Sequence, residues 1–232
     1  MVDQGSAAFT VTVCKDGPLL VKGDVVLRRV AIEPEGAHYV YVDKGEIEHD
    51  EVFALCRSGM SFNAPFCDGT HFSFGFDGTE TAPRSGYTDR AKRTEGDGIF
   101  LLDDFDMCAL ARFCHTDKGK IWELMKRTGE PGVNELIVQA ADECPAGRLT
   151  VFDTNTGQKL EPEYPNEIAV LDDPQLRCGG PLWIRGDFVI VGADGVPYEK
   201  RSKYTLCRCG QSANKPLCDC KHVHARWNEV GK

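Results

Sequence analysis

The sequence lacks the features that mark membrane proteins and several large classes of enzyme. No apolar run approaches the roughly 20 residues that a membrane-spanning helix needs, and the first eight residues contain neither a basic stretch nor an apolar core. We therefore expect no signal peptide. No phosphate-binding P-loop, dinucleotide-binding glycine fingerprint or nucleophile elbow is present. These absences predict a cytoplasmic, non-enzymatic protein with no membrane partner.

Positive charge is also scarce relative to negative charge. The 232 residues include 27 Lys and Arg against 36 Asp and Glu, which gives a net charge of −9. An acidic protein repels phosphate backbones, so we expect no nucleic-acid partner. Hydrophobic residues make up 41% of the chain, which is enough for one large core or two small ones.

Cysteine, in contrast, is abundant. The chain has 11 cysteines, and an odd number cannot pair completely in disulfides. Without an export signal, clustered cysteines indicate metal binding rather than a disulfide framework. Cys14 and Cys178 lie outside the clusters, beside two Gly-Pro dipeptides, and are predicted to be packing thiols.

An internal repeat divides the chain. Residues 17–27 resemble residues 180–190, and each copy predicts a strand, a Gly-Asp turn and a second strand, as in a hairpin. Each copy precedes a cysteine-rich loop, 56–71 in the first and 207–222 in the second. The first copy is longer by an excursion around 33–49. Two copies of one unit predict an intramolecular pseudo-dimer.

The second loop places three thiols and one imidazole within sixteen residues: Cys207, Cys209, Cys218 and His222. Two cysteines one residue apart can hold one iron from an extended strand. Cys218 and His222, four residues apart, lie on one face of a helix start and can hold a second iron. Zinc fingers usually space their paired ligands differently, by two to four residues with a longer stretch between the pairs.

This loop resembles the CDGSH iron–sulfur family, whose pattern is C-x-C-x2-S/T-x3-P-x-C-D-G-S/A/T-H. Ser212 and Pro216 are in register with that pattern. The resemblance implies a [2Fe–2S] cluster held by three cysteines and one histidine. Cys220 stands where the family has glycine. It is either a small replacement or an alternative thiolate ligand.

The chemistry of this loop suits a redox-active anion. Asp219 is predicted to be the N-cap of a helix turn whose N–H groups point toward the cluster. A neutral imidazole in place of a thiolate makes reduction easier than with four cysteines. Acid should loosen the cluster, because protonation of His222 competes with the iron–nitrogen bond. Such a site can serve as an electron carrier or as a cluster donor.

The first loop contains Cys56, Ser58, Cys67 and His71, and Ser61, Pro65, Asp68 and Gly69 also match the family pattern. Only the second ligand departs from it, because Ser58 replaces cysteine. A serine alkoxide is a harder donor, so a cluster here should be less easily reduced and more labile. Three possibilities are open: a [2Fe–2S] cluster completed by Ser58 or water, an empty structural copy, or another metal such as zinc.

Between the loops lies a segment of different character. Hydrophobic spacing predicts helices over 107–113, 121–127 and 133–141, a strand over 148–153 and a linker over 161–166. Cys108 and Cys114, followed by Cys144-Pro145, resemble mono-cluster ferredoxins and the divergent mono-cluster segment that accompanies CDGSH loops in some bacterial proteins. Ala111 occupies the place of a middle cysteine.

Three thiolates suit a [3Fe–4S] cluster, or a [4Fe–4S] cluster with one outside ligand. His115 is a candidate for that ligand, although a lone histidine is more often a surface or core residue. The alternative is that the three cysteines pack a helical hairpin.

We therefore expect an α+β fold in which two β-rich CDGSH-type halves, 1–90 and 166–232, pack as a pseudo-dimer around a helical mono-cluster segment, 91–165. The predicted function is electron transfer, with cluster storage or transfer as a further use. The predicted partner is a redox protein or an apo-protein cluster acceptor, and the pseudo-dimer is expected to be monomeric. The rival functions are a redox or iron sensor, a small electron-transfer subunit of a redox enzyme, and a zinc-stabilised structural module.

Overall fold

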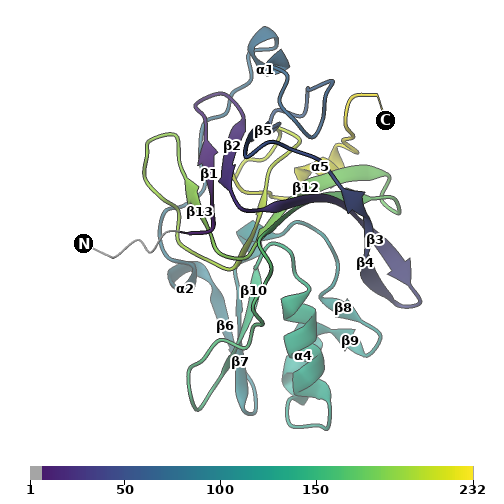
Figure 1. Ribbon diagram of the computed structural model, residues 1–232. Helices are drawn as coiled ribbons and strands as arrows, with labels where there is room; N and C mark the ends of the chain where they lie inside the picture. The colour runs from purple at the N-terminus through teal and green to yellow at the C-terminus, as the bar shows by residue number, and fades with distance from the viewer. Residues whose placement is uncertain (1–6, 232) are drawn as a thin grey trace.

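The computed structural model describes residues 7–231, and the chain is mostly β with few helices (Figure 1). The strands are β1 Phe9–Val13, β2 Leu19–Gly23, β3 Val26–Glu35, β4 His38–Glu46, β5 Val52–Leu55, β6 Lys92–Glu95, β7 Ile99–Asp103, β8 His115–Thr116, β9 Gly119–Lys120, β10 Leu149–Asp153, β11 Glu167–Asp173, β12 Cys178–Arg185, β13 Phe188–Val191 and β14 Lys203–Leu206. The α-helices are α1 Thr70–Ser73, α2 Tyr87–Arg90, α3 Ile121–Leu124, α4 Val133–Asp142 and α5 Lys221–His224, with short 3-10 turns at Phe105–Met107 and Met125–Arg127.

The two larger sheets each combine strands from both ends of the chain. One has the order β13-β1-β2-β5 and the other the order β14-β12-β11-β3-β4. The contacts between the two ends are parallel: β1 pairs with β13, with Phe9 opposite Phe188, and β3 pairs with β11, with Val26 opposite Glu167. Backbone hydrogen bonds therefore join the two cysteine-loop halves directly.

The expected hairpins at the two Gly-Asp turns are wrong. β2 and β3 flank the first turn but lie in different sheets, and β12 and β13 flank the second turn in the same way. Gly23 and Gly186 have φ values of 120° and 105°, which favour glycine. A Cβ at Gly23 would lie 2.4 Å from the Ala8 carbonyl oxygen, and one at Gly186 would lie 2.6 Å from Asn166 Oδ1. Each turn carries the chain from one sheet to the other.

The main hydrophobic core lies between these two sheets. Its fully buried side chains come from strands of both, including Val11, Leu19, Leu55, Ile168, Val170, Leu182 and Leu206. The alternation of buried and exposed residues along β1 and β2 is that of strands with one face on a core. Neither half contributes this core alone, because strands of both halves line it.

The central segment has its own sheet and core. Strands β10, β7 and β6 form an antiparallel sheet, and α4 lies along β10 in the lower part of Figure 1. The core between them includes Leu101, Leu124, Ile137 and Val151. The expected helical stretches 121–127 and 133–141 are helical, and the expected strand near 148–153 is β10.

The helix expected over 107–113 is wrong. After the 3-10 turn the chain is irregular, with positive φ at Leu110 and Arg112. Met107, Ala109, Ala111 and Phe113 are buried while the residues between them are more exposed. This period of two is typical of extended chain rather than helix. The segment therefore forms a loop with its cysteines on the side opposite the buried row.

The long excursion of the first half is the β3–β4 hairpin. Its Tyr41 ring stacks on Phe113 at 4.2 Å and on Trp183 at 4.6 Å between ring centroids. The Tyr41 hydroxyl donates to the Glu143 carbonyl oxygen at 2.7 Å. The hairpin thus joins the central segment to β12. Within residues 7–231, no helix has the length and apolar character to cross a membrane.

The two cysteine loops meet backbone to backbone at two glycines. A Cβ at Gly59 would lie 2.6 Å from the Cys209 carbonyl oxygen, and a Cβ at Gly210 would lie 2.3 Å from the Ser58 carbonyl oxygen. Both glycines have a φ of 77°. The contact is reciprocal, because each loop places its glycine against the residue that precedes the other loop's glycine.

This contact predicts a stability difference between two substitutions. Gly210→Ala and Gly195→Ala share nearly the same backbone strain, with φ of 77° and 78°, but nothing lies within 4 Å of a Cβ at Gly195. We expect Gly195→Ala to cost about 1–2 kcal/mol. Gly210→Ala should cost about 1–3 kcal/mol more, because its Cβ overpacks the loop contact. Urea unfolding measures both, and equal losses would contradict the close packing of the loops.

Candidate metal centres

The C-terminal loop begins where β14 ends. The Cys207 amide donates to the Pro216 carbonyl oxygen at 2.8 Å, and the Cys218 amide donates to the Thr205 carbonyl oxygen at 2.9 Å. These bonds hold the two cysteines on adjacent, paired stretches of backbone. The Sγ atoms of Cys207 and Cys209 are 3.7 Å apart, and Cys218 Sγ lies 3.4 Å from His222 Nδ1. All four side chains are buried.

Side-chain hydrogen bonds fix the rest of this loop. The Ser212 hydroxyl donates to the Leu217 carbonyl oxygen at 2.7 Å and accepts from the Asn214 amide at 3.0 Å. The Asp219 carboxylate accepts from the Ala213 and Lys221 amides at 2.8 and 3.2 Å. The predicted N-cap is displaced by one residue, because α5 begins at Lys221 and its N-cap is Cys220.

Burial keeps most of these ligand candidates uncharged in the free protein. Burial raises the pKa of Cys218 well above its usual value and lowers the pKa of His222 to about 4. The Cys209 thiol donates toward Cys207, which lowers the pKa of Cys207 to about 7 and raises that of Cys209. The thiols would lose their protons on binding a positively charged metal centre, which is the usual coupling of metal binding to deprotonation.

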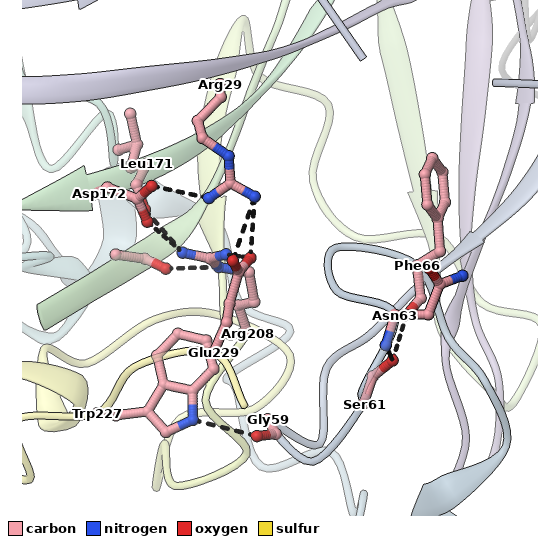
Figure 2. Close-up of polar contacts among 11 residues, drawn as sticks. Arg29, Gly59, Ser61, Asn63, Phe66, Leu171, Asp172, Arg208, Trp227 and Glu229 are labelled. Atoms are coloured by element: carbon pink, nitrogen blue, oxygen red, sulfur yellow. Dashed lines mark hydrogen bonds and ion pairs between the residues drawn. The ribbon is translucent and has the colours of Figure 1, made fainter. Parts of the chain in front are cut away.

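Arg208, between the two candidate ligand cysteines in the sequence, is almost fully buried. Figure 2 shows its side chain beside Asp172 and Glu229. It donates to the carbonyl oxygens of Gly180 at 2.9 Å and Leu171 at 2.8 Å. It also pairs with Asp172 at 3.1 Å and with Glu229. Arg29 from β3 binds the same two carboxylates, at 2.7 and 3.2 Å. Two arginines and two carboxylates thus form one ion cluster behind the C-terminal loop.

The N-terminal loop repeats this geometry residue by residue. Cys56 Sγ lies 3.4 Å from Ser58 Oγ, and Cys67 Sγ lies 3.3 Å from His71 Nδ1. The Cys56 and Cys67 amides donate to the carbonyl oxygens of Pro65 and Ala54, both at 2.8 Å. All four predicted ligands are therefore brought together, with Ser58 Oγ where the other loop has Cys209 Sγ. Cys67 is more exposed than its counterpart Cys218.

The supporting hydrogen bonds of the two loops also correspond. The Ser61 hydroxyl donates to the Phe66 carbonyl oxygen at 2.6 Å, and it accepts from the Asn63 amide at 3.1 Å (Figure 2). The Asp68 carboxylate accepts from the Phe62 and Thr70 amides at 2.8 and 3.0 Å. These amide bonds lower the pKa of Asp68 to about 2. The serine and aspartate of the motif thus shape the loop rather than line the ligand pairs.

Arg57 occupies the place of Arg208 but has different partners. It donates to the carbonyl oxygens of Cys14, Gly17 and Gly78 at 2.7, 2.7 and 2.9 Å. Burial lowers its pKa, and the carboxylate of Glu80 acts on it only through longer-range attraction. The positive charge behind the N-terminal loop is therefore matched less fully than the one behind the C-terminal loop.

Sequence reasoning did not single out the two buried arginines. The available signal was that both loops carry arginine directly after their first cysteine, at Arg57 and Arg208. It also did not place Cys14 near a site. A Cβ at Gly17 would lie 3.2 Å from Cys14 Cβ and 3.7 Å from His71 Nε2, so Cys14 borders the N-terminal loop. His71 Nε2 is itself buried without a hydrogen-bond partner among the described residues.

The three central cysteines meet at one small cavity. Cys108, Cys114 and Cys144 all line it, together with Ala111 and Arg148. Arg148 is held by Asp103 through two hydrogen bonds of 2.5 and 2.9 Å. Burial, together with the nearby Cys144, raises the pKa of Cys114 to about 12. The structure therefore brings together the three predicted ligands, from a loop rather than from a helical hairpin.

His115 lies outside that small cavity. Its ring is exposed and borders two larger cavities beside the segment. Burial, together with the positive charges of Lys120 and Arg112, lowers its pKa.

Among residues 7–231, the His, Cys, Asp and Glu side chains form no group of three or more that could hold a single metal ion.

Comparison with known protein families gives matches along most of the chain. A family described as an iron-binding zinc finger of CDGSH type matches residues 16–72 and again residues 179–223. A family described as a divergent 4Fe-4S mono-cluster matches residues 94–154, between the two. Searches of curated proteins and of solved structures return no match to the chain.

The ion cluster behind the C-terminal loop predicts an unequal response to two charge removals. Glu229→Gln leaves two arginines with fewer carboxylates inside the protein, and we expect a loss of about 3 kcal/mol. Glu130→Gln removes an exposed partner of Arg127 and should leave stability almost unchanged. Chemical denaturation of both variants measures the difference. Equal stabilities would contradict a supporting role for Glu229.

Proposed function

The chain carries two CDGSH-type iron-binding segments with a divergent 4Fe-4S mono-cluster segment between them, and on this premise we propose that it is an electron-transfer protein with up to three iron–sulfur clusters. Storage or transfer of a cluster is a second use of the same sites. The proposed role needs no catalysis by the chain itself. The observation that carries the proposal is the same pairing of four matched ligand atoms in each of two touching loops.

At the C-terminal loop we assign a [2Fe–2S] cluster to Cys207, Cys209, Cys218 and His222. The four ligands form two pairs rather than one convergent group, and a two-iron cluster takes two protein ligands at each iron. His222 would bind through Nδ1, the nitrogen that faces Cys218. The cluster would supply one-electron chemistry. The chain's own contribution is a dry pocket and an N–H group, because the Cys220 amide donates to Cys218 Sγ at 3.4 Å.

At the N-terminal loop we assign a second [2Fe–2S] cluster to Cys56, Cys67, His71 and Ser58. The support is the position of Ser58 Oγ, which matches that of Cys209 Sγ in its distance to the first cysteine of the loop. An alkoxide is a harder donor than a thiolate, so this cluster should be the harder of the two to reduce.

In the central segment we assign a [3Fe–4S] or [4Fe–4S] cluster to Cys108, Cys114 and Cys144. The support is their shared cavity and the match of residues 94–154 to the mono-cluster family. With this cluster, every cysteine-rich region of the chain takes part in one function.

The arrangement of the halves favours electron movement within the molecule. The exchanged strands and the reciprocal contact of Gly59 and Gly210 support an intramolecular pseudo-dimer whose two loops touch. Arg57 of one loop also attracts the Cys207 thiolate of the other. The contact between the loops supports electron transfer from one proposed cluster to the other.

The proposed partner is a redox protein or an apo-protein that accepts a cluster. The net charge of −9 suits docking on a basic surface. The structure has 11 free cysteines and no disulfide among them, which suits a reducing cytoplasm.

Metal analysis of anaerobically purified protein tests the number of clusters. We expect about seven or eight irons per chain with matching acid-labile sulfide, since two [2Fe–2S] clusters and a three- or four-iron cluster sum to that number. EPR spectroscopy of the reduced protein should then resolve more than one species. A colourless protein loaded with zinc would contradict the proposal.

A matched pair of variants tests the role of Ser58. Ser58→Cys should shift one reduction potential to a more positive value, because a thiolate is a softer ligand for iron than an alkoxide. Cys209→Ser should shift the potential of the other cluster to a more negative value. Potentiometric titration followed by EPR measures both shifts. If Ser58→Cys moved no potential and added no iron, Ser58 would not be a ligand.

A further inference from the structure

Cys220 has a backbone conformation that L-residues with side chains rarely adopt. Its φ is 63°, and its counterpart in the N-terminal loop is Gly69 with φ of 86°. A side chain in the left-handed region is strained in a way that glycine avoids. Both residues donate their amide to the preceding cysteine of the motif, at Cys218 and Cys67. The backbone role is therefore shared, and the thiol is what distinguishes Cys220.

The surroundings of the two positions also differ. A Cβ built on Gly69 would meet nothing within 4 Å. Cys220, in contrast, lines the cavity that separates the C-terminal loop from the central segment. This cavity has a volume of about 740 Å³. Asp219 and Ala213 border it on the side of the C-terminal loop, and Cys108 and Cys114 border it on the side of the central segment.

Two central cysteines belong to both cavities. Cys108 and Cys114 line the small cavity that they share with Cys144, and they also line the large cavity that contains Cys220. The thiol of Cys220 and those of the two central cysteines therefore border one shared cavity.

The central segment lacks one ligand of its own. In the stretch from Cys108 to Cys114, a ferredoxin-like spacing places Ala111 where a thiolate would complete a four-cysteine set. We propose that Cys220 supplies that missing thiolate, so that Cys108, Cys114, Cys144 and Cys220 together hold a [4Fe–4S] cluster. The inference rests on the proposed central cluster and specifies its fourth ligand and its type.

The binding step is a simple ligand exchange. The Cys220 thiol would lose its proton to solvent and its sulfur would replace a water molecule on the fourth iron, and no electron is transferred. The four cysteines come from two parts of the chain that lie far apart in sequence, the central segment and the C-terminal loop. Only Asp219 separates Cys218, a ligand of the C-terminal cluster, from Cys220. One short peptide would then connect two clusters.

His115 is the competing candidate for the fourth ligand. It also lines the large cavity, but its ring is exposed and it follows Cys114 directly in the chain. His115 does not have a positive φ. Cys220 does, and it carries a side chain at the position where the N-terminal loop has Gly69. The observations therefore favour the thiol over the imidazole.

The test compares Cys220→Gly with two matched controls in the full chain purified anaerobically. Glycine suits the backbone at 220, so the variant should fold and keep its C-terminal [2Fe–2S] signal. We expect it to lose about one iron per chain and, after chemical oxidation with ferricyanide, to show the EPR signal of an oxidised [3Fe–4S] cluster. His115→Ala and Cys178→Ala should both retain the [4Fe–4S] cluster. Cys220→Ser should keep four irons there with an altered EPR spectrum.

The outcomes separate this inference from the proposed function. A central [4Fe–4S] cluster that survives in Cys220→Gly, or that is lost in His115→Ala, would overturn the assignment of Cys220 while leaving the central cluster in place. Loss of only the [2Fe–2S] signal in Cys220→Gly would also overturn it, because Cys220 would then serve the C-terminal loop. A native chain with only about four irons would remove the central cluster itself.

Discussion

The C-terminal half depends on the hydrogen bonds and ion pairs of the buried Arg208 guanidinium. A full charge taken out of water is stable only when several acceptors surround it. Those acceptors come from β11, from β12 and from Glu229 near the end of the chain. Because Arg208 stands between Cys207 and Cys209, the contacts that satisfy its charge also fix the backbone of both candidate ligands. Distant parts of the fold are thereby tied to the geometry of one candidate metal centre.

The N-terminal half surrounds its buried arginine with fewer charged groups than the C-terminal half does. The two candidate metal centres therefore differ in their electrostatic surroundings. Arg57 is held by carbonyl oxygens, so more of its positive charge is available to a nearby anion. Positive charge would stabilise the reduced form of the proposed cluster, whereas an alkoxide from Ser58 would stabilise the oxidised form. The two differences act in opposite directions on the same potential. The charge of Arg57 would therefore limit the difference in reduction potential that Ser58 creates between the two proposed clusters.

Short-range spacing made much of the site predictable, and long-range contacts made the rest unpredictable. The ligand sets of both loops follow from patterns confined to sixteen residues, and the structure brings each set together. The helix expected over 107–113 is absent because the buried residues of this stretch alternate with a period of two, which is typical of extended chain. The passage of the chain from one sheet to the other at Gly23 and Gly186 could not be predicted from either copy of the repeat alone. The proximity of Cys220 to Cys108 depends on how two separate segments pack.

The parallel pairing of β1 with β13 has a consequence for the making of the protein. β1 can pair with β2 as soon as both strands are made, but Phe188, which pairs with Phe9 on the other side of β1, leaves the ribosome only when most of the chain has been made. Contacts that span such a separation form late and slowly. Until the core shared by the two halves closes, the N-terminal thiols are less well buried than in the finished fold. Protecting them from oxidation during that interval is a task for the cell rather than for the finished molecule.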